Sequence, residues 1–155
     1  MTHTFFQRAS RRTAGFTLIE VMIVVAIIGI LSAIAVPAYS DYVIRSRIPD
    51  ATSALAAKRV QMEQFFQDNL TYAGGPGCVS DTTTSQSFTF DCAGDSGVAA
   101  TATVFTIEAV GVNSMTGFVF TIDQDNAKAT TMTTGAPSGW TGNASCWVSK
   151  KGGVC

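Results

Sequence analysis

One carboxylate stands inside the most apolar part of this chain, and its position is the clearest chemical signal of the sequence. Glu20 is the only charged residue between Phe16 and Ser40. A carboxylate at the centre of a lipid bilayer costs about 2.5–3.5 kcal/mol on insertion scales, and less near the surface. If the chain is cut after Gly15, the new α-amine of Phe16 lies one helical turn before Glu20 and is a natural partner for it, in the same chain or in a neighbour. The alternative is a carboxylate that reaches the hydrated membrane surface.

All four cysteines, Cys78, Cys92, Cys146 and Cys155, follow the apolar segment. They form no Cys-x-x-Cys pair, and the single histidine, His3, lies far from them in sequence, so a zinc site is not indicated. An even number of cysteines in a small exported domain is typical of disulfides. Four cysteines allow three pairings, and closure of short loops favours Cys78–Cys92 and Cys146–Cys155. The alternative is four reduced, buried thiols in a cytosolic protein.

Few other residues could carry chemistry. A single histidine excludes a histidine-based triad or acid–base pair, and we find no paired carboxylates, phosphate loop or nucleophile motif. The sequence therefore predicts a protein that is not an enzyme and needs no metal or cofactor. A net charge of −1 argues against a nucleic-acid coat protein. Lys150 and Lys151 beside Trp147 are more typical of a solvated turn, and DNA is kept only as an alternative partner.

The charges divide the 155 residues into three parts. Arg8, Arg11 and Arg12 precede the apolar segment without any acid, and a polar domain follows it. In an export signal the cleavage site normally follows the apolar part, whereas here the small residues Ala14 and Gly15 precede it. Cleavage after Gly15 would therefore leave the apolar segment on the mature chain, which would carry seven bases and eleven acids.

The apolar segment, residues 16–36, is long enough to cross a membrane. Its 21 residues would span about 31 Å as a helix, against a bilayer core of roughly 30 Å. Gly29 lies in a stripe of small residues where a second helix could approach closely. Pro37 predicts a kink or local melting, because proline removes one helical hydrogen bond. Helical periodicity then resumes and ends near Asn69.

Strand patterns follow the helix. Alternating residues predict antiparallel strands over 104–110, 118–123 and 128–134, with a short strand at 88–90. In the first of these, Glu108 falls on the polar side of the alternation. The sequence predicts an α+β fold in which the amphipathic half of a long N-terminal helix covers an antiparallel sheet of about three to four strands, while its apolar half protrudes. The stretch 135–155 is predicted to form a loop that a disulfide holds to the sheet, with Trp140 and Trp147 as packing anchors.

The N-terminal residues carry a specific resemblance. The sequence GFTLIE at residues 15–20, followed by the apolar run and Pro37, closely resembles the N-terminus of type IV pilin precursors of class a. The resemblance extends to about residue 70 and then weakens. Further on, the Cys-Trp dipeptide at Cys146-Trp147 is similar to that of the PilE-like pilins and minor pilins of proteobacteria.

This resemblance implies roles for individual residues. A membrane peptidase would cut between Gly15 and Phe16 and then methylate the Phe16 amine, so that this chain is a substrate. Glu20 would neutralise the Phe16 amine of an adjacent subunit during assembly. Gly29 and Pro37 would mark where the helix can bend. The Cys146–Cys155 loop would match the disulfide-bounded region at the pilin C-terminus, and a Cys78–Cys92 bridge would be an addition to it.

The resemblance also implies an organisation, partners and a location. Residues 1–15 would be a removed leader, residues 16–48 a protruding assembly helix and residues 49–155 an extracellular head. The partners would be copies of the same chain and other pilins in a helical filament, the prepilin peptidase, the inner-membrane assembly machinery and, before assembly, membrane lipid. The precursor would span the inner membrane once and then join a surface pilus acting in adhesion, twitching motility or DNA uptake. The alternatives are a pseudopilin of a type II secretion system and a membrane-anchored periplasmic binding or enzymatic domain.

Overall fold

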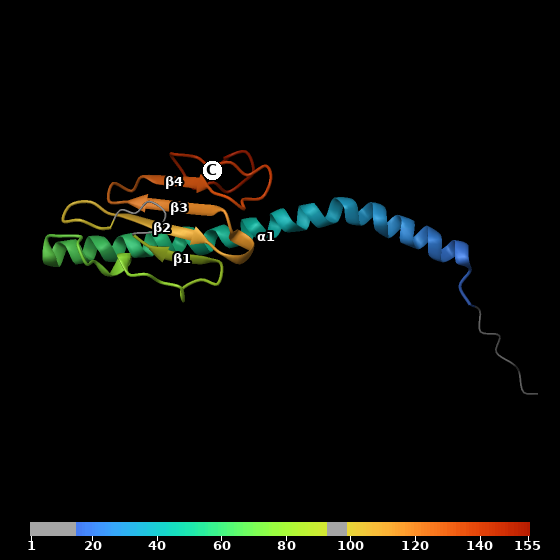
Figure 1. Cartoon of the computed structure of the whole chain (residues 1–155), viewed down its shortest axis with the longest axis horizontal. Helices are drawn as coiled ribbons and strands as arrows, with labels where there is room; N and C mark the ends of the chain where they lie inside the picture. The colour runs from blue at the N-terminus through green and yellow to red at the C-terminus, as the bar shows by residue number, and fades with distance from the viewer. Residues whose placement is uncertain (1–14, 93–98) are drawn as a thin grey trace, which may run out of the picture. The chain divides into compact units, whose positions relative to one another are not determined.

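The protein is an α+β structure in which one long helix packs on a four-stranded antiparallel sheet (Figure 1). A computed structural model of the chain describes residues 15–92 and 99–155. The regular elements are α1 (Leu18–Asn69), the short 3-10 helix η1 (Pro76–Cys78), β1 (Phe88–Asp91), β2 (Thr106–Gly111), the 3-10 helix η2 (Asn113–Met115), β3 (Phe118–Asp123) and β4 (Lys128–Met132). This architecture confirms the predicted fold class, and the strands lie close to the predicted ranges.

The chain divides into two compact units, the first ending at Tyr39 and the second, called the head below, comprising Ser40–Cys155. Residues 1–14 of the predicted leader, with His3 and the three leader arginines, lie outside the described residues. Within α1 the backbone stays helical through Gly29 and Pro37, so the local melting considered at Pro37 is not observed. Flexibility at these two positions stays a prediction.

One face of α1 covers the sheet because its apolar residues recur every three or four positions. Six side chains of α1 are buried in the head: Ile44, Ile48, Ala51, Leu55, Lys58 and Met62. They pack against a sheet face rich in phenylalanine, where Phe88, Phe90, Phe118 and Phe120 are fully buried. Burying this apolar area drives the head to fold, at about 25 cal/mol per Å² removed from water. The packing of the helix on the sheet was predicted from the same periodicity.

The four strands follow one another in space as they do in sequence, in the order β1-β2-β3-β4. Short connections are enough for such antiparallel neighbours. The β3–β4 turn is closed by Asp123, whose Oδ1 accepts a hydrogen bond from the backbone N–H of Ala127 at 2.8 Å. Gly111 ends β2 where a larger residue would collide with the carbonyl group of Met115.

Glu108 is buried, although the alternation in the sequence places it on the polar side of its strand. It alternates with Ile107 and Ala109 along β2, as the sequence predicts, yet its side chain is only 2 % exposed. Its cross-strand neighbours are Asp91 on β1 and Thr121 on β3. A two-residue alternation identifies which face of a sheet a side chain occupies, but it does not show whether that face is covered.

Candidate functional site

The beginning of α1 carries a reciprocal capping arrangement that the sequence analysis did not identify. The Thr17 backbone N–H donates to the Glu20 carboxylate at 3.4 Å, and the Glu20 N–H donates to the Thr17 hydroxyl at 3.3 Å. These two bonds satisfy backbone donors that a helix N-terminus otherwise leaves unpaired. The signal in the sequence was the Thr-x-x-Glu spacing at residues 17–20. Glu20 therefore has a structural role in the single chain in addition to any role in assembly.

Around Glu20 the helix exposes apolar side chains on every side. Phe16 is 84 % exposed, and the larger side chains onward to Val36 are all more than half exposed or close to it. Among the described residues, α1 is the one helix long and apolar enough to cross a membrane, judged by length and composition. Such a surface is stable only in lipid or against other apolar helices.

Among the described residues, no cation forms an ion pair with the Glu20 carboxylate. The ion pairs of the described residues are all in the head and involve Lys58, Arg59 and Lys151. The structure places Gly15 and Phe16 directly before the cap, four to five residues ahead of Glu20. A charge in this apolar setting would be compensated if an amine were delivered from a neighbouring chain.

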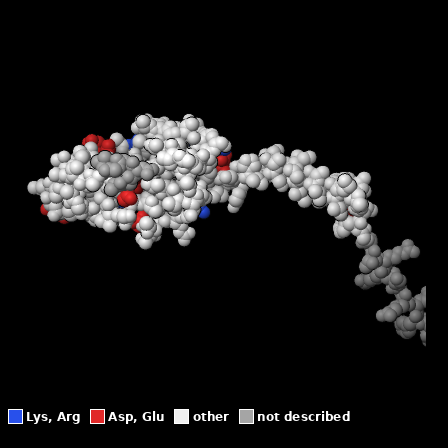
Figure 2. Space-filling view, viewed as in Figure 1, with Lys and Arg blue, Asp and Glu red and all other residues white. Residues whose placement is uncertain are grey.

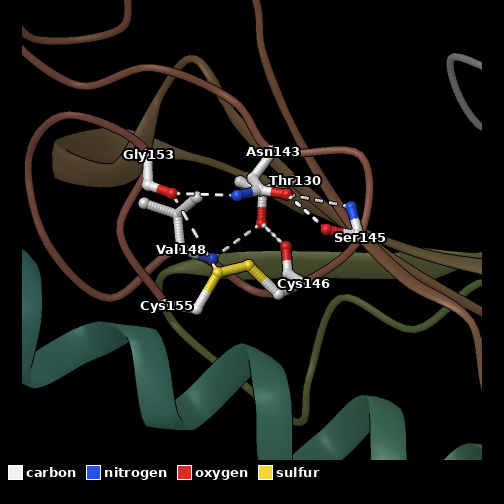
Figure 3. The surroundings of a disulfide bond; sticks show 7 residues. All are labelled: Thr130, Asn143, Ser145, Cys146, Val148, Gly153 and Cys155. Atoms are coloured by element: carbon white, nitrogen blue, oxygen red, sulfur yellow. Dashed lines mark hydrogen bonds between the residues drawn. A yellow bond between two sulfur atoms is a disulfide. The ribbon is translucent and has the colours of Figure 1, made fainter.

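A second group of residues closes the C-terminal loop (Figure 3). The structure contains a disulfide between Cys146 and Cys155. The Thr130 hydroxyl of β4 donates to the carbonyl oxygen of Cys146 at 3.0 Å and accepts from the N–H of Val148 at 2.9 Å. At the other side of the loop, the Asn143 amide donates to the carbonyl oxygen of Gly153 at 3.0 Å. The loop is thus fastened to the sheet by hydrogen bonds as well as by the disulfide.

The two tryptophans lie under this C-terminal segment. Trp140 is 5 % exposed and meets Phe118 edge to face, with ring centroids 5.1 Å apart. The Trp147 indole N–H donates to the carbonyl oxygen of Thr121 at 2.8 Å, and the Lys128 ammonium lies 4.6 Å from the centre of its ring. Both side chains pack against the sheet, as predicted.

The second disulfide, Cys78–Cys92, joins η1 to the residue after β1. The segment between them is also held to α1, because the Lys58 ammonium lies 2.9 Å from the Asp81 carboxylate. Hydrogen bonds from the Thr84 hydroxyl and from the backbone N–H of Thr83, together with Lys58, hold the pKa of Asp81 far below its ordinary value. We call this pair with its threonines the Asp81 clamp. The sequence analysis missed it, since no local pattern links residue 58 to residue 81.

Among residues 15–92 and 99–155, no group of three or more His, Cys, Asp or Glu side chains could hold a metal ion. The features of interest are therefore an apolar helix with one carboxylate, and a disulfide-bonded head. A long N-terminal helix with an antiparallel sheet packed on its second half and a disulfide at the C-terminus defines the type IV pilin fold.

Comparison with known proteins agrees with this class. Residues 37–119 match the family described as "Type IV minor pilin ComP, DNA uptake sequence receptor". Residues 10–36 match the prokaryotic N-terminal methylation motif. Because the first match covers more than half of the chain, the chain belongs to the ComP family of type IV minor pilins.

Curated relatives match over a shorter stretch. Fimbrial protein EcpC of Eikenella corrodens is 52 % identical over 54 residues, which is 35 % of each chain. The type IV major fimbrial protein FimA of Dichelobacter nodosus is 54 % identical over 54 residues, which is 35 % of this chain and 34 % of FimA. The match thus spans about a third of the length of these relatives. They are named as fimbrial proteins and not as enzymes.

Proposed function

We propose that this chain is a structural subunit of a type IV pilus and assembles through α1 after its leader is removed. The observation that carries the proposal is the exposed apolar surface of residues 16–36 with the single acid Glu20. In this proposal a prepilin peptidase cuts between Gly15 and Phe16 and methylates the Phe16 amine. The mature chain stays in the inner membrane until it joins the filament.

Packing apolar helices together removes a large hydrophobic area from water, and this drives assembly. Apolar contact alone specifies the axial stagger poorly, because a slip by one helical turn changes the buried area little. A misplaced Glu20 would lie unpaired in a low dielectric, which costs far more. The pair between Glu20 and the Phe16 amine of a neighbour would therefore select one stagger.

Processing can be tested by intact-mass analysis of filaments sheared from cells that express the chain. We expect a mature species that begins at Phe16 and carries one additional methyl group. The added methyl group distinguishes the membrane peptidase from adventitious proteolysis at the same bond. A filament protein that retains residues 1–15 would refute the proposed processing.

DNA binding is a second candidate, and the observation that favours it is the family match over residues 37–119. The surface charges limit the area available for it. In the head, Lys58 and Lys151 are in ion pairs with Asp81 and Asp41. Lys150 is exposed, and the Lys128 ammonium lies over Trp147. In this proposal a phosphate backbone would contact Lys150 near Trp147.

The full-length chain in detergent micelles would test this candidate with fluorescent duplex DNA. If the chain binds DNA here, Lys150→Ala should weaken binding uniformly across sequences and reduce the slope of log affinity against log salt by about one unit. Gln61→Ala, on an exposed part of α1, serves as the control. If Lys150→Ala binds DNA as tightly as the unsubstituted chain, Lys150 does not contact the DNA.

A further inference from the structure

A polar hollow lies in the head between α1 and the segment that precedes β1. Its volume is about 520 Å³, and all of its lining residues are among those described. The helix contributes one charged residue of each sign, Arg47 and Asp50, and the segment 84–87 contributes hydroxyl and amide groups. Ala54 and Ala57 complete the lining, so the hollow offers charged and hydrogen-bonding groups beside small apolar side chains.

Arg47 is the most informative residue of this hollow. Its guanidinium donates to the Ser87 hydroxyl at 2.6 Å, while Ser87 itself is 1 % exposed. A guanidinium has five N–H donors, and among the described residues no carboxylate lies within ion-pair distance of Arg47. Arg59, Lys58 and Lys151 of the head do have such a partner. The hollow thus presents a half-buried, oriented cation that a carboxylate from outside could complete.

The opposite end of the head presents carboxylates. Two of these acids, Glu63 and Asp68, lie on the last turns of α1, and Asp125 lies on the β3–β4 turn. Arg59 of α1 donates to the carbonyl oxygen of Gln124 in that turn. Figure 2 shows acidic side chains exposed on this part of the head. Asp68 is exposed and makes no ion pair with the described residues. Gln64 lies four residues earlier on the same helical face and adds an amide donor beside it.

We propose that the hollow at Arg47 receives Asp68 from a second copy of this chain. The proposal rests on the proposed pilus function, since subunits inserted in one membrane orientation repeat head to tail along a filament. The end of α1 in one copy then lies at the level of Arg47 in another. The Asp68 carboxylate then pairs with the Arg47 guanidinium.

The geometry of α1 sets the distance between the two copies. Arg47 and Asp68 are 21 positions apart in one helix, which corresponds to about 32 Å along its axis. Two copies joined by this contact are therefore displaced by about 32 Å along the direction of α1. Copies with other displacements would not bring Asp68 to the hollow.

The test exchanges the charges in full-length protein expressed in piliated cells. The readout is the amount of chain in sheared filaments relative to the membrane fraction. Arg47→Glu and Asp68→Arg should each reduce this ratio at least about fivefold, because they place like charges in contact. The double variant should restore most of it. A double variant as defective as its parents would overturn the proposal.

Two controls separate this contact from other causes. Arg45→Glu makes the same change of charge on an exposed part of α1 outside the hollow, and should have little effect. Asp125→Arg makes the same change of charge as Asp68→Arg at another exposed acid of that end of the head, and should also incorporate well. A loss in either control equal to that of Arg47→Glu would contradict a specific pair. Absence of the unsubstituted chain from filaments would instead refute the pilus function itself.

Discussion

Replacing Glu20 by valine should strongly reduce incorporation of this chain into filaments without preventing its maturation. The apolar surface of residues 16–36 would be complete, so membrane insertion should be at least as favourable as before. The chain would lose the charge that selects one stagger, and the Phe16 amine of the neighbour would be left without a partner. We expect at least a tenfold lower ratio of chain in sheared filaments to chain in membranes, an effect of about 1.4 kcal/mol or more.

Two further variants separate the roles of Glu20. Glu20→Gln retains an acceptor for the Thr17 N–H and removes only the charge, so it should be as defective as valine if the charge pair governs assembly. Thr17→Val removes the hydroxyl that accepts from Glu20, and should cost only a modest part of helix stability. Normal incorporation of the glutamine variant would show that the capping arrangement, and not the charge, is what matters.

Much of the fold could be predicted from local sequence patterns. The apolar run and its single acid identify the N-terminal half of α1, and the spacing of Ile48, Leu55 and Met62 identifies the face that covers the sheet. The alternation predicts a strand over residues 118–123, and β3 has these same bounds. These features depend on residues close in sequence, where helical and strand periodicities are directly visible.

Contacts between distant residues were not visible in the same way. From the sequence alone, Lys58 would be placed on the solvent-exposed side of an amphipathic helix. In the structure it is only 9 % exposed, and its ammonium lies 2.9 Å from the Asp81 carboxylate. Arg47 reads similarly, and its bond to Ser87 joins residues 40 positions apart. Such pairs form only when the segment before β1 is folded back on α1. The sequence contains the charges but no periodicity that pairs them.

Removing the carboxylate of the Asp81 clamp should strongly destabilise the head. Asp81→Ala would leave the Lys58 ammonium nearly buried without its anion, since the two side chains are only 11 % and 16 % exposed. Loss of one member of a buried pair is strongly destabilising, and we expect a decrease of about 2–3 kcal/mol in the free energy of unfolding. Urea unfolding of the full-length chain in micelles, followed by the fluorescence of Trp140 and Trp147, would measure it.

The companion variants separate the charge from the packing. Lys58→Met in the Asp81→Ala background removes the unpaired cation and retains an apolar stem over Phe90, whose ring lies 5.6 Å from the Lys58 ammonium. This double variant should therefore be more stable than Asp81→Ala alone. Asp68→Ala, which removes an exposed acid, should change the unfolding free energy by less than about 0.5 kcal/mol. Equal losses in Asp68→Ala and Asp81→Ala would contradict the clamp.

The clamp also predicts the direction of the pH dependence. The pKa of Asp81 is lower in the folded head than its ordinary value of 3.8, chiefly because the Thr84 hydroxyl and the Thr83 N–H donate to the carboxylate. The unfolded chain therefore binds a proton more readily than the folded one, and the stabilisation is present above the ordinary value and declines as the pH falls below it. Between pH 7 and pH 3, the contribution of Asp81 to the free energy of unfolding should stay constant until the pH approaches 3.8, and should then begin to decline. In Asp81→Ala that acid-dependent component should be absent, and an unchanged pH profile in this variant would show that other carboxylates account for it.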